Sequence, residues 1–346
     1  MKLQSVSHVK VKYIFIILLT ITLLFGCKKE TTSASISPSL PLPGMYVNNR
    51  YLFSENNDTV ILKGFNAMIV YWDIHGDINF PEIEKTGANC VRIFWNLDAP
   101  TPQPSDLDKV LENCISHHMI PVICLWDATG KWDQLQVCVD YWTSTPIVSV
   151  LKKYEKHLII NIANEPGDHE MGNIVFRNTY ASAVRQLRNA GLHMPLIIDA
   201  DRWGRNADAV LDNGPSLIET DPDHNLLFSW HLWDPENYMT GTIQEIDRII
   251  TKAVDKNICF VVGEFGPCEQ TDNCSATPIN WEHMIETAYN NNIGYLPWVW
   301  KWTDCHSIVN DSIGIYGSWA NTEWGENVAV KNTYSIQKTA KRPSDF

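Results

Sequence analysis

Two glutamates at the ends of apolar runs are the residues of this sequence best suited to catalysis. Glu165 follows the run HLIINIAN, and Glu264 lies within ICFVVGEF. Two carboxyl groups can share catalysis when one stays protonated to give a proton to a leaving oxygen and the other is ionised to attack an electrophilic carbon. Cleavage of a glycosidic bond uses such a pair. Neither glutamate alone is evidence of catalysis. The hypothesis of a catalytic pair therefore requires secondary-structure elements that bring the two side chains together.

The elements that could position them are eight short runs rich in β-branched and aromatic residues. The runs open near Val60, Asn89, Met119, His157, Pro195, Asn225, Ile258 and Gly294, at intervals of 29 to 38 residues. Amphipathic helical patterns lie between several of them. One runs from Phe176 to Leu187, and another runs from Ile246 to Val254 after Thr242 and Glu245, which have capping-box spacing.

Apolar strands that alternate with helices predict a parallel sheet covered on both faces. Eight such units fit an α/β fold with a single (β/α)8 TIM-barrel domain, which we place at residues 44–346. A doubly wound open sheet is the alternative. That fold normally has a glycine-rich turn after its first strand, whereas this strand ends Gly64-Phe65-Asn66 without a GxGxxG motif.

In a barrel the carboxyl ends of all strands meet at one mouth, where a site can be built. The predicted strand ends carry polar and aromatic residues around the two glutamates: Asn66, Arg92, Trp126, Asn164, Trp203, His231, Trp233 and Trp298. The chain also has 14 tryptophans, 12 tyrosines and 11 phenylalanines, more than a core of this size needs. Exposed aromatic planes bind flat, weakly hydrophobic ligands such as sugars.

The formal net charge of −13 indicates which ligands the chain favours. An acidic chain repels phosphate backbones, so nucleic acid is not an expected partner. Acidic polysaccharides such as pectin are disfavoured for the same reason. A neutral β-linked polysaccharide or oligosaccharide is the expected partner, and we expect the protein to be a monomer.

The N-terminus has the pattern of an export signal. Lys2, Lys10 and Lys12 precede an apolar run over residues 13–26 that is too short to span a bilayer. The run ends Leu24-Phe25-Gly26-Cys27, which resembles a bacterial lipobox. We therefore predict a signal peptide at 1–26, lipidation at Cys27 and a tether at 27–43, giving a lipid-anchored envelope protein, periplasmic or on the cell surface. An ordinary signal peptide and secretion are the alternative.

The remaining cysteines and acidic residues suggest neither metal nor cofactor. Asp127, Asp199 and Asp201 follow predicted strands, where aspartates usually cap helices or accept from loop amides. We expect buried thiols at Cys90, Cys124 and Cys259, and one bridge among Cys268, Cys274 and Cys305, whose pairing stays open.

Motifs at the strand ends resemble a known family. Asn161-Ile162-Ala163-Asn164-Glu165-Pro166, Val262-Gly263-Glu264-Phe265-Gly266, Arg92 and His231 resemble glycoside hydrolase family 5. Lys63-Gly64-Phe65-Asn66, Asp127-Ala128-Thr129-Gly130 and Trp203-Gly204 are similar to its bacterial β-mannanase branch.

The resemblance implies a role for each residue. Glu165 would be the general acid/base and Glu264 the nucleophile of a retaining reaction, with carboxyl groups about 5 to 5.5 Å apart. Arg92 would keep Glu264 ionised, and Asn164 would hydrogen-bond the 2-hydroxyl of the sugar. His231 would tune the protonation of the pair, and Trp298 would form the floor of the subsite.

Two positions depart from the family pattern. Relatives carry histidine where this chain has Trp126, and they carry His-x-Tyr where it has His231-Leu232-Trp233. An indole N–H donates a hydrogen bond but cannot accept one or titrate. Either the substrate differs from mannan, or another residue supplies the missing contacts, or catalysis is weaker.

The sequence thus predicts a retaining, endo-acting hydrolase of β-1,4-linked polysaccharide, with β-mannan or glucomannan favoured. A cellulase-type β-1,4-glucanase and an exo-β-glycosidase are alternatives within the same class. A surface lipoprotein that binds glycan without cleaving it is the alternative from another class.

Overall fold

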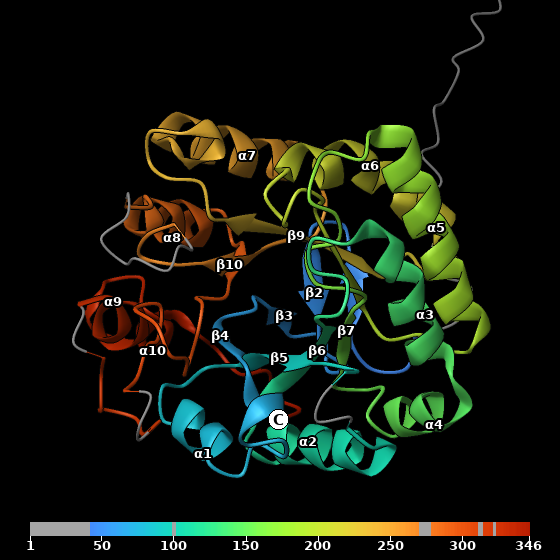
Figure 1. Ribbon diagram of the computed structural model, residues 1–346, viewed down its shortest axis with the longest axis horizontal. Coiled ribbons are helices and arrows are strands. Elements are labelled where there is room, and N and C mark those ends of the chain that lie inside the picture. Colours follow the sequence, from blue (N-terminus) through green and yellow to red (C-terminus); the bar gives the residue numbers. More distant parts are fainter. Residues whose placement is uncertain (1–41, 99–101, 270–277, 311–313, 321–322) are drawn as a thin grey trace, which may run out of the picture. The chain divides into compact units, whose positions relative to one another are not determined.

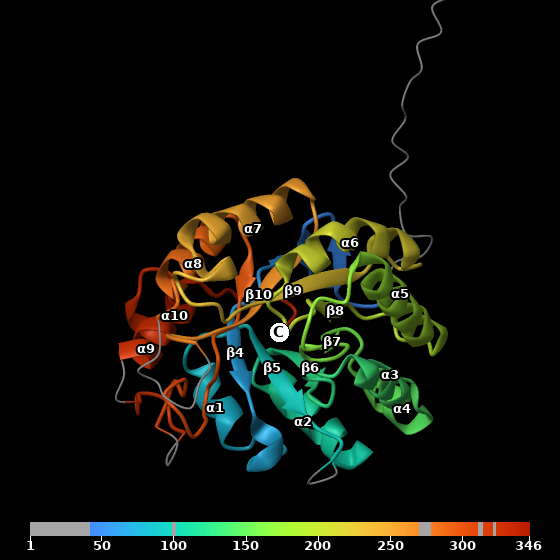
Figure 2. The same cartoon turned by 45° about the horizontal axis from the view of Figure 1, so that its top comes forward.

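Eight parallel strands form the central sheet of the computed structural model, which describes residues 42–98, 102–269, 278–310, 314–320 and 323–346. In order they are β4 (Gly64–Ala67), β5 (Cys90–Trp95), β6 (Ile120–Leu125), β7 (Ile159–Asn161), β8 (Leu196–Asp199), β9 (Leu226–Leu232), β10 (Phe260–Phe265) and β11 (Gly294–Tyr295). Each pairs with the next, and a parallel bridge between Lys63 and Tyr295 joins the last strand to the first. The sheet therefore closes into the predicted (β/α)8 barrel (Figure 2).

Helices surround the barrel because their apolar faces pack on the outward faces of the strands (Figure 1). They are α1 (Asn79–Glu84), α2 (Pro104–Ser116), α3 (Leu135–Thr143), α4 (Thr145–Lys153), α5 (Asn173–Asn189), α6 (Ala207–Thr220), α7 (Ile243–Asp255), α8 (Trp281–Asn290), α9 (Glu323–Glu326) and α10 (Ile336–Thr339). Short 3-10 turns lie at 69–71, 132–134 and 239–241, and a π-helical turn at 327–331. The helices predicted around residues 176–187 and 246–254 are confirmed as α5 and α7, and Thr242 Oγ1 caps α7 by accepting from Glu245 N at 3.2 Å.

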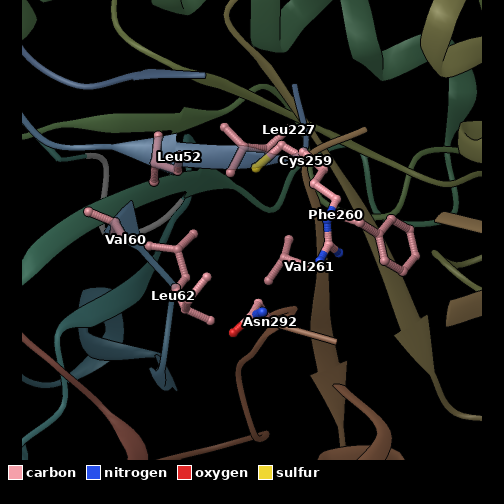
Figure 3. A pocket seen from close by; sticks show the side chains of 11 residues that line it. Leu52, Val60, Leu62, Leu227, Cys259, Phe260, Val261 and Asn292 are labelled. Atoms are coloured by element: carbon pink, nitrogen blue, oxygen red, sulfur yellow. The ribbon is translucent and has the colours of Figure 1, made fainter. Parts of the chain in front are cut away.

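The first barrel strand, β4, begins at Gly64, four residues after the predicted start of its apolar run at Val60. Thr59–Val60 belongs to a separate antiparallel sheet, in which β3 pairs with β2 (Tyr51–Phe53) and β2 with β1 (Tyr46–Asn48). Side chains of this small sheet cover the amino-terminal end of the barrel, where Leu52 and Val60 join a cluster with apolar residues of the barrel strands. Figure 3 shows them around a small pocket with Leu62, Leu227, Cys259 and Val261.

The described cysteines agree with the prediction of buried thiols in the strands and one disulfide bridge in the later loops. Cys90, Cys124 and Cys259 are buried free thiols, as predicted. Cys305 is disulfide-bonded, Cys268 is free, and Cys274 lies outside the described residues.

The described residues do not include the predicted export segment. The signal peptide, Cys27 and nearly all of the tether lie outside the described ranges. Among the residues described, no helix has the length and apolar character needed to cross a membrane.

Candidate active site

The ends of β7, β9 and β10 bring Glu165, His231 and Glu264 into one buried cluster. His231 Nδ1 lies 2.7 Å from Glu165 Oε1 and 3.6 Å from Glu264 Oε2. A carboxylate oxygen of Glu165 and a carboxylate oxygen of Glu264 lie within 4.8 Å of each other. Inverting glycosidases need about 6.5 to 9.5 Å between their carboxyl groups to admit a water, so this closer approach suits direct attack by a carboxylate.

A bulge in β10 aims Glu264 toward His231. The register with β9 shifts between Val262 and Glu264, so that Glu264 pairs with His231. Gly263 occupies the bulge, and a Cβ there would lie 2.3 Å from Ser229 Oγ and 2.8 Å from His231 Nε2. Glycine is thus required for the close approach of the two strands.

Arg92 is the buried hub that holds the cluster together. Its Nη1 donates to Glu264 Oε1 at 2.7 Å. Its other hydrogen bonds run to Asn66 Oδ1 at 3.1 Å, Cys124 Sγ at 3.3 Å, Asn161 Oδ1 at 2.8 Å, Asn164 Oδ1 at 2.7 Å and Asp199 Oδ2 at 3.0 Å. Because the guanidinium group is engaged on every side by protein atoms, Arg92 orients its neighbours, and the prediction that it binds substrate directly is not supported.

The two glutamates have different hydrogen-bond donors. Glu264 accepts from Arg92 and, at 3.1 Å, from Trp233 Nε1, which stabilises its ionised form. The side chain of Glu165 contacts His231. Glu165 also has a positive φ of 43°, a conformation that its backbone bonds to Asp199 Oδ2 and Gly130 N support.

These surroundings set the order in which the two carboxyl groups ionise. Burial, with the negative charge of Asp199, raises the pKa of Glu165 to about 8. Burial also raises the pKa of Glu264, but only to about 7, because His231 and Arg92 lower it against the repulsion from Glu165. Glu264 therefore ionises first, which suits a nucleophile, and Glu165 keeps its proton longer, which suits an acid.

Asp199 is a site residue whose contribution the sequence analysis missed. Its carboxylate accepts from Arg92 Nη2, from Glu165 N at 3.2 Å and from Asn161 Nδ2 at 3.1 Å. As predicted, it accepts from a loop amide, that of Glu165, and it also links this backbone N–H to the guanidinium group of Arg92. Its position at the end of the fifth barrel strand was the signal that could have identified it.

The side chains of the two predicted asparagines have different hydrogen-bond partners. Asn66 donates to the carbonyl oxygens of Gly263, Leu296 and Pro297 and accepts from Arg92, so it is occupied within the protein. Asn164 accepts from Arg92 and donates one Nδ2 hydrogen to Thr129 Oγ1 at 2.9 Å. An amide nitrogen carries two hydrogens, and a hydrogen bond from the Asn164 side chain also lowers the pKa of Glu165.

The predicted aromatic residues separate into buried and exposed groups. Trp233 is 1% exposed and packs on Trp298, whose indole nitrogen is buried without a hydrogen-bond partner in the described structure. Trp126 lies in a cluster of rings with Tyr71 and Trp302. Trp72 joins this cluster and is 39% exposed, and Trp203 is 42% exposed and packs over Gly130. By contrast, Trp95 and Trp300 are core residues.

Within the described ranges, two groups of side chains have metal-like spacing, and the surroundings of each oppose a cation. The donor atoms of Glu165, His231 and Glu264 converge, but Arg92 Nη1 already neutralises Glu264 at 2.7 Å. Cys268, Cys305 and His306 also converge, but the disulfide-bonded sulfur of Cys305 is not available as a thiolate ligand.

Comparisons with known proteins agree with this geometry. Residues 54–304 match the family described as cellulase (glycosyl hydrolase family 5). The chain is 28% identical to the mannan endo-1,4-beta-mannosidase of Cellvibrio japonicus (strain Ueda107) over 88% of this chain and 69% of that protein. It is 28% identical to the same-named protein of Salipaludibacillus agaradhaerens over 88% and 96%. The mannohexaose complex of Thermomonospora fusca β-mannanase matches with a TM-score of 0.74 and 25% identity, covering 86% of this chain and 98% of that one.

Proposed function

The chain belongs to glycosyl hydrolase family 5, a retaining two-glutamate family of glycoside hydrolases, and from this membership we propose that it is an endo-acting β-1,4-mannanase. The observation that carries the proposal is the buried Glu165–His231–Glu264 cluster, with carboxylate oxygens within 4.8 Å. The relatives named as mannan endo-1,4-beta-mannosidases support the choice of mannan.

In the proposed mechanism the two glutamates act in sequence. The carboxylate of Glu264 attacks the anomeric carbon while the carboxyl group of Glu165 protonates the leaving oxygen. The resulting glycosyl ester on Glu264 is hydrolysed by a water from which Glu165 takes a proton. The side-chain amide of Asn164, which lies beside Glu165, is the donor that would meet a sugar hydroxyl.

Endo action is supported by exposed rings on opposite sides of the barrel mouth. Trp72 follows β4 and Trp203 follows β8, and these strands lie four places apart in the ring of eight. A polysaccharide that contacts both rings crosses the mouth with its middle over the glutamates. An enzyme that releases single terminal sugars instead has a mouth that is closed on one side of the glutamates.

A product assay with three polymers tests the proposal. The protein is incubated separately with β-mannan, glucomannan and a β-1,4-glucan, and soluble oligosaccharides are measured over time. We expect a mixture of manno-oligosaccharides from the first reaction. Glu264→Gln is the blank, and Glu170→Gln, the same change at an exposed position, is the matched control that should keep full activity.

Each other outcome identifies a different function. Cleavage of glucan alone would discard mannan as the substrate, and release of a single sugar from chain ends would discard endo action. Binding of polymer without products, in a protein that circular dichroism shows to be folded, would favour the glycan-binding lipoprotein.

A further inference from the structure

A buried lysine far from the glutamates lines a second pocket in the barrel wall. Lys63 lies directly before β4, at the bridge to Tyr295 that closes the sheet. The neighbouring Leu62 points into the apolar cluster at the amino-terminal end of the barrel, so Lys63 points outward, where it meets Tyr289 of α8. The side chain is only 3% exposed.

The ammonium group of Lys63 lacks an anionic partner. It lies 4.4 Å from the ring centroid of Tyr289 and 4.6 Å from that of Tyr295. Among the described residues, no hydrogen bond or ion pair reaches its Nζ. A buried charge is normally paired with an opposite charge, because removing it from water is costly. The attraction between an ammonium group and two ring faces does not offset this cost.

The pocket beside this ammonium group is positively charged and large enough for a small ligand. Its volume is about 370 Å³, and its lining residues are Thr59, Ile61, Lys63, Tyr289, Asn290, Asn292, Lys338, Thr339 and Lys341. Three of these residues are lysines, and none of the residues given is acidic. In a chain with a net charge of −13, a pocket with three lysines and no carboxylate is exceptional.

The polar groups around the pocket match an oxyanion. Asn290 and Asn292 line it with the lysines and can add neutral donors, whereas the hydroxyl of Thr339 donates to Ser335 O at 2.9 Å. Asn292 also borders the apolar pocket of Figure 3, which bounds the site on the barrel side. Lys338 belongs to α10 and Lys341 follows it, and both line the pocket together with Tyr289 and Asn290 at the end of α8.

We propose that this pocket is a binding site for a doubly charged tetrahedral oxyanion, either free or as a phosphate monoester, with Lys63 at its base and Lys338 and Lys341 at its rim. The anion would supply the partner that Lys63 lacks.

The proposal predicts that binding is coupled to a proton. Burial and the charge of Lys341 lower the pKa of Lys63 to about 7 in the empty pocket. The other groups that face it are the phenols of Tyr289 and Tyr295 and, at the rim, the ammonium group of Lys338. A bound dianion favours the charged amine, so affinity is highest below pH 7 and falls as the pH rises.

Isothermal titration with sulfate tests the site, because sulfate stays doubly charged across the range used. We expect saturable 1:1 binding at pH 6 and constant ionic strength, weakened roughly thirtyfold at pH 8.5 given a pKa of about 7. Lys63→Met should weaken binding at least tenfold, and Lys341→Met several-fold. Lys256→Met removes an equal charge from a side chain that is 41% exposed elsewhere, and should leave affinity within twofold of the parent.

Several results would overturn the proposal. They are absence of saturable binding at pH 6, equal affinities at pH 6 and 8.5, and unchanged affinity in both Lys63→Met and Lys341→Met. If Lys63→Met does not fold, the exposed Lys341 still provides the test. A sugar phosphate titrated alongside distinguishes the ligand source: tighter binding than sulfate indicates an ester, and equal binding indicates a free anion.

Discussion

At the scale of residues, the distinction between the two glutamates rests on their neighbours. Glu264 accepts from two N–H donors of Arg92 and Trp233, and Glu165 lies beside the negative charge of Asp199. A donor stabilises a carboxylate, and a like charge destabilises it. The same side-chain type can therefore serve as nucleophile in one place and as acid in the other.

The pH profile of the parent enzyme should follow from these two groups. The proposed mechanism requires Glu264 ionised and Glu165 protonated, so kcat/KM should fall at low pH as Glu264 gains a proton and at high pH as Glu165 loses one. With pKa values of about 7 and about 8, the maximum is expected between pH 7 and 8. Initial rates on soluble mannan across pH 4 to 10 would check it, and a maximum near pH 4 would contradict the assigned order.

Trp233→Phe isolates the hydrogen bond of the indole to the nucleophile. Phenylalanine keeps an aromatic ring against Trp298 but removes the donor that lies 3.1 Å from Glu264 Oε2. A hydrogen bond to a charged group contributes about 1.5 to 3 kcal/mol, so the pKa of Glu264 should rise by about one unit or more. The acidic limb of the kcat/KM profile then moves toward the alkaline limb, so that the profile narrows and its maximum falls. Parallel movement of both limbs, or none, would show that Trp233 only fills space.

Glu165→Ala tests the acid. Loss of a general acid costs about 10² to 10⁴ in rate, and the loss is smaller when the leaving group needs no proton. Activity on polymer should therefore drop much further than activity on an aryl mannoside with an acidic phenol. Equal losses on the two substrates would count against the role of Glu165.

At the scale of elements, the turns after the strands decide how closely the catalytic side chains approach. Gly204, in the turn after β8, has φ of +71°, and a Cβ there would lie 2.6 Å from His231 Cγ. His231 N also donates to Gly204 O at 2.9 Å. The turn therefore packs directly against the histidine that connects the two glutamates.

Gly204→Ala compared with Gly87→Ala measures this contact. Gly87 has a similar φ of +77°, but no atom lies within 4 Å of the position of its Cβ. Both changes incur the cost of a left-handed conformation, about 1 to 2 kcal/mol, but only the first also displaces His231. We expect Gly204→Ala to lose more unfolding free energy in urea and at least tenfold in kcat, with kcat unchanged in Gly87→Ala. Similar effects of the two substitutions would rule out the steric role of Gly204.

At the scale of the whole molecule, the barrel separates its two ends by function. The carboxyl ends of the strands carry the glutamates and the exposed rings, and the other end is closed by β1, β2 and β3 over an apolar cluster. The oxyanion pocket that we propose lies in the wall near that second end. A ligand there leaves the mouth free for a polysaccharide.

We propose further that the protein is held at a bacterial envelope by lipid on Cys27, which the lipobox-like sequence supports. Cys27→Ser should move the protein from the membrane fraction to the soluble fraction without changing its activity on soluble mannan. Immunoblots of the separated fractions would show this. Unchanged partitioning would refute lipidation at Cys27 as the anchor.

The sequence by itself determined the barrel and the chemistry of its mouth. The eight strands and the helices α5 and α7 could be predicted because apolar periodicity is a local property of the chain. The placement of Arg92, Glu165, His231 and Glu264 at strand ends follows from the barrel, since its strands all run in one direction.

Only the tertiary structure decided which side chains touch. Contacts between distant segments link Asp199 to Arg92 and to the backbone of Glu165, and they bring the indole N–H of Trp233 to Glu264. Such contacts also decide which tryptophans are buried in the core and which are exposed. The small sheet that contains Thr59–Val60 escaped prediction because its apolar run continues into the first barrel strand. Hydrogen bonding and burial are set by packing in three dimensions. The pattern of residues along the chain specifies neither the hydrogen-bond partner of a side chain nor how deeply that side chain is buried.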